Sequence, residues 1–236
     1  MAISFIGAGV SSTINGGNPV ITLPSVVAGD CILTCYSAPR SITMVARSSG
    51  GTAYTAVSSQ MVNGNLNFQV FQRYADSTGE TTVTCSGTGN SQDGMAAVAL
   101  VFRGTRTTAP VDAYASTTGT SSRPDGPDIS VMDSGEVLVS CVGSLANTAT
   151  VTAPTSFLNL NSTGATDTRS VTTAMSWVAS TNRGSNSITA YSSFTSAAWA
   201  GVTVALMPNS TTWYPHATDS APETVRDART VIISNY

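Results

Sequence analysis

Apolar residues occur along this chain in short runs, and no window repeats them with the 3.6-residue period of an amphipathic helix. The runs are rich in β-branched residues and are separated by clusters of Gly, Ser, Asn and Pro, a pattern typical of strands and turns. At 65–70 apolar and amide residues alternate, so we expect a strand with one buried and one wet face. The pattern predicts an all-β protein, with strands at 20–23, 31–36, 42–46, 54–57, 66–74, 81–85 and 96–102, and again at 129–131, 137–142, 172–178, 187–191 and 199–207.

Part of this pattern occurs twice. The segment Gly29–Cys35 (GDCILTC) is matched by Gly135–Cys141 (GEVLVSC), and the resemblance continues downstream at nearly the same offset, from Glu80–Cys85 to Ser185–Ala190 and from Ala96–Phe102 to Ala200–Leu206. Self-similarity at one offset indicates that a single β unit was used twice. We therefore expect an antiparallel, jelly-roll-like β-sandwich built from two internal repeats, residues 19–104 and 127–208.

Three segments lie outside the repeats. Residues 105–126 are rich in Thr, Ser, Pro and Gly and are predicted to be a loop that joins the two units. The pattern leaves open whether this loop links two sandwiches or crosses over within one. We favour one combined two-sheet sandwich, because separate halves would leave a long, nearly uncharged surface bare. Residues 1–18 and 209–236 are predicted to be extended N- and C-terminal arms.

Charge narrows the classes of partner. Charged residues make up 10% of the chain, against about 25% in typical domains, and none of them is Lys. The net charge of −3 and the lack of a basic patch argue against nucleic acid as a partner. A weakly charged exterior predicts that other subunits cover part of the surface, whereas a soluble monomer rich in Ser and Thr is the alternative.

The N-terminal sequence MAISFIG has no basic region followed by a long apolar run, so we expect no secretory signal. No stretch approaches the roughly 18 uninterrupted apolar residues of a membrane span. We therefore expect a protein that is made in a cytoplasm and has no membrane partner.

Metal binding is not expected from the cysteines. The four lie in apolar, strand-like runs, without a CxxC pair and far in sequence from the single His216. Cys35 and Cys141 occupy equivalent positions in the two repeats and share strand faces with apolar residues such as Leu33 and Val139. We interpret all four cysteines (Cys31, Cys35, Cys85 and Cys141) as reduced core thiols, and we predict no metal and no cofactor.

Catalytic chemistry is also not expected. Nucleophilic catalysis needs a base beside the nucleophile, and the only histidine, His216, lies in the C-terminal arm beside aromatic residues. The few glutamates do not suggest the carboxylate pair of a glycosidase. Asp30 and Glu136 match across the repeat, so we assign both to turns, where the carboxylate accepts backbone N–H groups. We predict that the protein is not an enzyme, with a hydrolase as the least favoured alternative.

Arg103 and Asp112 flank a short turn and are close enough in sequence to pair. A bidentate structural clamp between them is our preferred interpretation. A contact between subunits is the alternative.

Several of these residues resemble a known module. Pro24 followed by Gly29-Asp30, then Tyr74-Ala75, Phe102-Arg103-Gly104 and Pro110-Val111-Asp112, resemble a β-sandwich module of tailed-bacteriophage virion proteins. The resemblance covers residues 18–115 directly and 126–208 through the repeat. It implies a virion location, shared by head decoration proteins and by tail or fibre proteins.

The leading hypothesis is a capsid decoration or cement protein, a homotrimer that binds between major capsid subunits. Its partner-binding residues are placed in the C-terminal arm, where large aromatic residues suit interface anchors: Trp213, Tyr214, His216 and Tyr236. Val231 and Ile233 are expected to add an edge strand to a neighbour. The alternative for the arm is that it folds back on its own sandwich.

A second hypothesis, from a different class, is a host-receptor or carbohydrate-binding adhesin on a tail or fibre. It needs aromatic platforms in a shallow groove, for which Tyr54 and Trp199 are the candidates.

Overall fold

The structure is a computed structural model that describes residues 2–209, apart from 15, 40–41, 77–78, 89–92, 132–134, 147–149, 168 and 180–182. The described chain is all-β, and every strand pair in it is antiparallel. None of its residues forms a helix that is long and apolar enough to cross a membrane. The fold class predicted from the hydrophobic pattern is therefore confirmed.

Sixteen strands make up the described chain. In the N-terminal half they are β1 (Ser4–Thr13), β2 (Val20–Thr22), β3 (Cys31–Pro39), β4 (Thr43–Ser48), β5 (Thr55–Ala56), β6 (Met61–Asn63), β7 (Leu66–Tyr74), β8 (Thr82–Thr88) and β9 (Met95–Arg103). In the C-terminal half they are β10 (Val111–Ser121), β11 (Ile129–Val131), β12 (Val137–Ser144), β13 (Leu158–Ala165), β14 (Val171–Ala179), β15 (Gly184–Asn186) and β16 (Ala197–Leu206).

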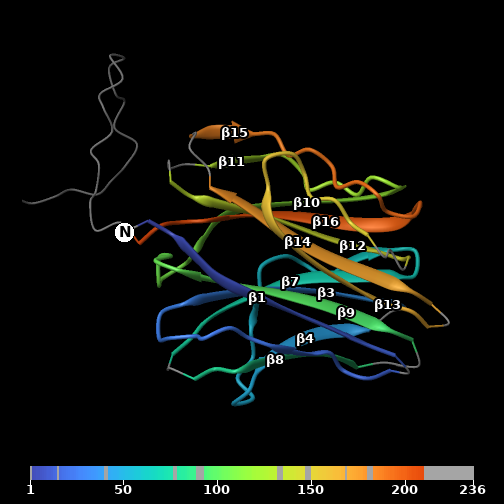
Figure 1. Ribbon diagram of the computed structural model, residues 1–236, viewed down its shortest axis with the longest axis horizontal. Coiled ribbons are helices and arrows are strands. Elements are labelled where there is room, and N and C mark those ends of the chain that lie inside the picture. Colours follow the sequence, from blue (N-terminus) through green and yellow to red (C-terminus); the bar gives the residue numbers. More distant parts are fainter. Residues whose placement is uncertain are drawn as a thin grey trace, which may run out of the picture.

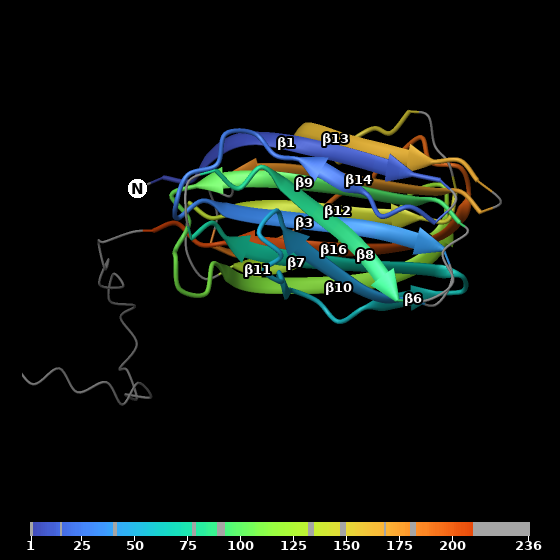
Figure 2. The ribbon, with the colours of Figure 1, turned by 90° about the horizontal axis from the view of Figure 1, so that it is seen from below.

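These strands form four stacked layers (Figure 1). The first large sheet has the order β1-β9-β3-β7-β5, with β6 also on β7, and the second large sheet has the order β10-β16-β12-β14-β13. The two large sheets face each other with their strands nearly aligned (Figure 2). The first outer sheet, β2-β8-β4, covers the far side of the first large sheet, and the second outer sheet, β11-β15, covers that of the second. The structure therefore has two outer sheets in addition to the two sheets of the expected sandwich.

The central core lies between the two large sheets and joins the two halves of the chain. Both halves contribute apolar side chains to it, among them Leu33, Phe68 and Phe102 from the first large sheet and Val139 and Met175 from the second. Burial on both faces explains why β3, β9 and β12 read as nearly continuous apolar runs instead of alternating ones. The two halves therefore share one core.

At one point the large sheets approach closely. A Cβ added at Gly143 on β12 would lie 2.2 Å from Ser37 Oγ and 2.6 Å from the ring of Phe68, so only glycine fits there. Beside it, Thr173 Oγ1 on β14 lies 2.7 Å from Ser37 Oγ and 2.8 Å from the carbonyl oxygen of Ala96 on β9. These buried hydroxyl contacts tie the second large sheet to the first.

Each half also has an outer core of its own. Between the first large and first outer sheets, Tyr36 stacks on Phe71, with ring centroids 5.8 Å apart, among residues such as Ile21 and Val83. On the other side, Tyr191 is fully buried and lies within hydrogen-bond distance of Ser140 O, at 2.7 Å. Each large sheet thus has a second apolar cluster on its outer face, built from its own half of the chain.

Three predicted segments are corrected by the strand pairing. Residues 4–13 of the expected N-terminal arm form β1, which pairs with β9 from Ser4↔Arg103 to Thr13↔Met95. The expected loop 105–126 contains β10, the 11-residue strand that pairs with β16. The strand expected at 187–191 is not formed, and β15 lies just before it. Both β1 and β10 are sheet edges, and edge strands are covered on fewer sides and so lack the apolar pattern of central strands.

The two halves have similar strand orders. In the first, an initial strand (β1) pairs with the last strand (β9), which pairs with β3 and then β7; in the second, β10, β16, β12 and β14 follow the same order. This order accords with the internal repeat seen in the sequence, and the repeat itself stays an interpretation of the sequence.

Candidate functional site

The Gly-Asp and aromatic-Arg-Gly motifs meet at one end of the first large sheet. Cys31 on β3 pairs with Phe102 on β9, so the residues just outside, Asp30 and Arg103, lie opposite each other. Arg103 donates from Nε to Asp30 Oδ1 (2.7 Å) and from an Nη to Asp30 Oδ2 (2.8 Å). Asp30 Oδ2 also accepts the backbone N–H of Val27 at 2.9 Å, which confirms its expected turn role. The two motifs therefore join the ends of β3 and β9 and fix the turn before β3.

The bidentate clamp predicted for Arg103 exists, but its acid is Asp30 and not Asp112. Asp112 lies on β10 in the second large sheet, whereas β3 and β9 are hydrogen-bonded neighbours. The reason is the strand register, which brings together residues 73 positions apart. Asp30 is fully buried while the Arg103 side chain is 43% exposed.

The second half does not repeat this clamp. Val137 on β12 pairs with Leu206 on β16, so the residue opposite Glu136 is Met207. In the first half Arg103 occupies that position. Glu136 is fully buried, and its assignment to a turn stays a prediction.

The four cysteines are buried and form no disulfide, as expected from the sequence. Cys31, Cys35 and Cys141 lie in the central core with Leu33 and Val139, which confirms the shared strand faces. Burial raises the pKa of the Cys31 and Cys85 thiols to about 12. Burial and the neighbouring Cys141 thiol raise the pKa of Cys35 well above its usual range. Groups of three or more His, Cys, Asp or Glu side chains able to hold a metal ion do not occur among the described residues.

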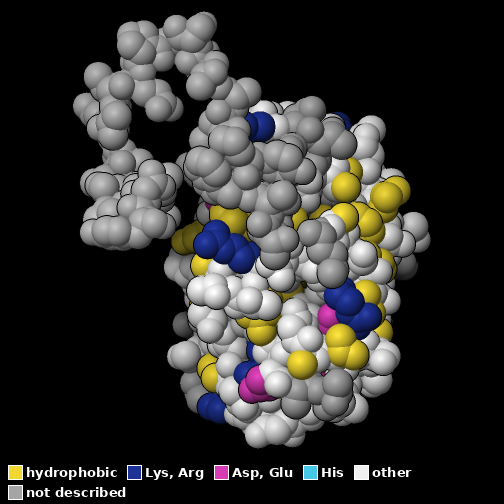
Figure 3. Space-filling model, turned by 90° about the vertical axis from the view of Figure 1, so that its left-hand side faces the viewer, with side chains coloured by type: hydrophobic (Ala, Val, Ile, Leu, Met, Phe, Trp, Pro, Cys, Tyr) yellow, Lys and Arg dark blue, Asp and Glu magenta, His cyan; other side chains and the backbone are white. Residues whose placement is uncertain are grey.

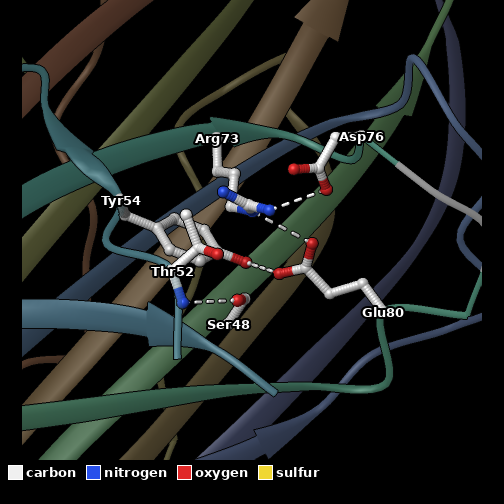
Figure 4. A network of polar contacts seen from close by, with 6 residues as sticks. All are labelled: Ser48, Thr52, Tyr54, Arg73, Asp76 and Glu80. Carbon is white, nitrogen blue, oxygen red and sulfur yellow. Dashed lines mark hydrogen bonds and ion pairs between the residues drawn. The ribbon is translucent and has the colours of Figure 1, made fainter. Parts of the chain in front are cut away.

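A polar pocket lies where the β4–β5 loop meets the β7–β8 loop (Figure 4). Its volume is about 190 Å³, and its lining is polar and partly charged: Ser48, Ser49, Gly50, Thr52, Arg73, Asp76, Gly79 and Glu80. The local sequence builds both loops from glycine turns, since Gly51 (φ +82°) and Gly79 (φ +96°) adopt the left-handed conformation that favours glycine. Ser48 Oγ accepts the Thr52 N–H at 3.1 Å and fixes the first loop.

Arg73, near the end of β7, organises this pocket. It donates to Glu80 Oε2 at 3.1 Å and to Asp76 Oδ1 at 2.8 Å, while Tyr54 Oη donates to Glu80 Oε1 at 2.7 Å. Burial acts to lower the pKa of Arg73, but the two carboxylates outweigh it and the pKa is raised. Burial and then the bond to Glu80 raise the pKa of Tyr54. The charged groups are therefore held rigidly at the wall of the pocket.

This arrangement offers a guanidinium, a carboxylate and hydroxyl groups to a small polar molecule. Asp76 is the exposed member, with 74% of its side chain accessible, whereas Arg73 and Glu80 are at 11% and 5%. Sequence reasoning named none of Arg73, Asp76 and Glu80 as a site residue. The available signal was the charged residue Arg73 at the end of the strand expected at 66–74, followed by Asp76 and Glu80 in the next turn.

The two aromatic platforms predicted for an adhesin are not exposed. Tyr54 is 6% exposed and packs in the outer core, with its hydroxyl used by Glu80. Trp199 is 8% exposed, and its Nε1 donates to Ser121 Oγ at 3.0 Å. Both predictions were wrong, because the outer core covers Tyr54 and the Trp199 ring lies against Gly119 on the neighbouring strand β10.

All the partner-binding residues predicted in the C-terminal arm lie outside the described residues: Trp213, Tyr214, His216, Val231, Ile233 and Tyr236. Figure 3 shows the end of the molecule at which the described chain stops, where a few charged side chains lie among hydrophobic and uncharged polar ones. The described chain ends at Asn209, whose N–H donates to Gly104 O at 2.7 Å.

Compared with protein-family models, with curated proteins and with solved structures, the chain matches none of them.

Proposed function

We propose that this protein is a non-catalytic structural protein of a tailed-bacteriophage particle, and specifically a capsid decoration protein that binds between major capsid subunits. Support comes first from the motifs that resemble the virion module. Their most distinctive residues, Asp30 and Arg103, form a structural clamp with a buried carboxylate at the end of two strands. A motif used in this way belongs to a scaffold and performs no reaction itself.

The observation that carries the proposal is that three long edges of the large sheets are open and carry almost no charge. The strands β1, β10 and β13 each end a large sheet, and Asp112 at the start of β10 is their one charged residue. Soluble monomers usually protect such edges with charged side chains, because unpaired N–H and C=O groups are templates for another chain. Uncharged edges on a weakly charged body favour a protein that works inside an assembly.

In this proposal the segment 210–236 anchors the protein to the particle. Trp213, Tyr214 and Tyr236 supply large aromatic surface, which dominates binding energy at the centre of an interface. The copies form a homotrimer, the symmetry suited to capsid three-fold positions.

The test is co-sedimentation of the purified chain with capsid particles that lack it. We expect the full chain to sediment with the particles, and both a chain ending at Asn209 and the variant Trp213→Ala/Tyr214→Ala to stay in the supernatant. Circular dichroism of both variants checks that the β structure is kept. Equal loading of the truncated chain refutes the anchor, and no loading of the full chain refutes the decoration role.

The polar pocket favours a second function, an adhesin that binds a hydroxyl-rich ligand such as a glycan. Arg73, Asp76 and Ser48 present fixed donors and acceptors of the kind that orient ligands in such pockets. A glycan array tests it, with Asp76→Ala as the variant that should lose binding. If the wild-type chain binds no glycan, this function is excluded.

A further inference from the structure

The open edge formed by β1 is the longest regular, uncharged edge of the first large sheet. Its ten residues contain no charged side chain, and its one β-bulge is confined to the start, between Phe5 and Gly7. From Gly7 to Thr13 the pairing with β9 is regular. Among the described residues, no strand pairs with the outer side of β1. Bulges and charges are what normally prevent edge pairing, and this part of β1 has neither.

Exposed apolar side chains accompany this edge. Val10 on β1 is 46% exposed, Ile14 just after it is 56% exposed, and Val20 on the neighbouring strand β2 is 50% exposed. Phe5, Ala8 and Val10 lie opposite Phe102, Leu100 and Val98, residues that belong to the central core. The row Phe5–Ala8–Val10 is therefore the outermost row of the core, and its end at Val10 is left uncovered.

The other two open edges are less suited to an apolar strand. On β10 Tyr114 is 50% exposed, but the exposed positions after it carry the small hydroxyl residues Ser116, Thr118 and Thr120. On β13 a register shift between Leu158 and Asn161 shortens the regular part to 161–165. The edge of β1 is thus the one of the three that carries an unbroken apolar row, Phe5–Ala8–Val10.

The sequence beyond Asn209 contains a segment with the composition of a strand. Residues 230–234 (TVIIS) are uncharged and β-branched, and Val231 and Ile233 share one face of an extended strand. Their spacing suits the alternating pockets of an open edge.

The length of chain after Asn209 determines which edges the segment 230–234 can reach. Asn209 bonds to Gly104, and a Cβ at Gly104 would lie 2.6 Å from Ala2 O, so the described chain stops beside the start of its own β1. The intervening residues 210–229 can extend to roughly 65 Å, about twice the ~34 Å length of a ten-residue strand. That length is not needed to reach the adjacent edge of the same copy, and it is sufficient to cross to another.

We propose that residues 230–234 of one copy add a strand to the open edge of β1 in a second copy. Val231 and Ile233 extend the row Phe5–Ala8–Val10 and cover Val10, while the backbone of 230–234 satisfies the free N–H and C=O groups of β1. Such a contact is head-to-tail, and it closes into a ring when the rotation between copies permits. It rests on the homo-oligomer of the proposed function and is independent of binding to a particle.

Cysteine cross-linking in the full chain tests the pairing. The four native cysteines are buried. Ser12→Cys lies on the same face of β1 as Val10, and Asn235→Cys lies on the same face of the added strand as Val231 and Ile233, so this pair provides the exposed thiols. We expect a mixture of the two single variants to form a cross-linked product of twice the 24.1 kDa chain mass under mild oxidation. A product found only within single chains of the double variant overturns the exchange between copies, and no product in either sample overturns the pairing.

Light scattering after size-exclusion chromatography gives a second test, with a matched control. Val10→Lys and Val62→Lys place the same charge at similarly exposed positions, 46% and 57%, on different strands. We expect Val10→Lys to reduce the oligomer to the 24.1 kDa monomer and Val62→Lys to keep it. A monomeric wild-type chain, or equal behaviour of the two variants, overturns the proposal. Co-sedimentation with capsids by a monomeric chain would leave the decoration role intact while refuting this contact.

Discussion

The contact between the two large sheets makes a quantitative prediction at Thr173. Its hydroxyl lies 2.7 Å from Ser37 Oγ and 2.8 Å from Ala96 O, at a fully buried position. Thr173→Val keeps the shape of the side chain and removes only this hydroxyl. Two hydrogen bonds of about 1 kcal/mol each are lost, and the buried Ser37 hydroxyl keeps one long contact, so we expect the free energy of unfolding to fall by about 2–3 kcal/mol.

Thr203 on β16 is the matched control. It is also fully buried, but its Oγ1 has no hydrogen-bond partner among the described residues. Thr203→Val therefore removes a buried hydroxyl that gains nothing from folding, and we expect the free energy of unfolding to stay within about 0.5 kcal/mol or to rise by up to about 1 kcal/mol.

Urea unfolding followed by circular dichroism measures the free energy of unfolding of both variants. The values are compared when both variants show the same slope of that free energy against urea concentration. The double variant Ser37→Ala/Thr173→Val should lose less than the sum of its two single variants, because both partners of one contact are then removed. If Thr203→Val destabilises as much as Thr173→Val, the loss of stability comes from placing valine in these sheets and not from the lost hydroxyl contacts. The argument for a polar tie between the sheets would then be refuted.

Two further predictions concern packing and ionisation. Gly143→Ala should lower the free energy of unfolding by about 1–3 kcal/mol, because the new methyl group overpacks against Ser37 and Phe68. Gly50→Ala is the control: its Cβ would come no nearer than 3.9 Å to another atom, so the free energy of unfolding should change by less than about 0.5 kcal/mol. Thermal unfolding compares the two variants. Because burial raises the pKa of Cys31 and Cys85 from 9.0 to about 12, the neutral thiols contribute stability that is fully present below pH 9 and is lost as the pH rises toward 12. Urea titrations between pH 8 and 11 should show this decline, and a thiol reagent at pH 8 should label no cysteine in the folded chain and all 4 after unfolding. Rapid labelling of the folded chain would contradict the burial of the thiols.

Features that depend on local pattern were predictable from the sequence. The short β-branched runs indicated an all-β fold, and the i, i+2 spacing of Cys31, Leu33 and Cys35 placed them on one buried face. The turn role of Asp30 followed from its position before a strand, and its carboxylate accepts the Val27 N–H. Each of these inferences needs only a few neighbouring residues, because strand periodicity and turn chemistry are local.

Features that depend on which strands become neighbours were decided only by the tertiary structure. The register of β3 on β9 pairs Arg103 with Asp30, 73 positions away in the sequence. Proximity in sequence had pointed to Asp112 instead. Stacking of four sheets covers Tyr54, and the meeting of two distant loops brings Arg73 to Glu80. The edge strands β1 and β10 carry little apolar pattern because they have a neighbour on one side only. Local periodicity reports burial, whereas pairing partners, pockets and edges arise from contacts between residues far apart in the chain, and these are set when the sheets assemble.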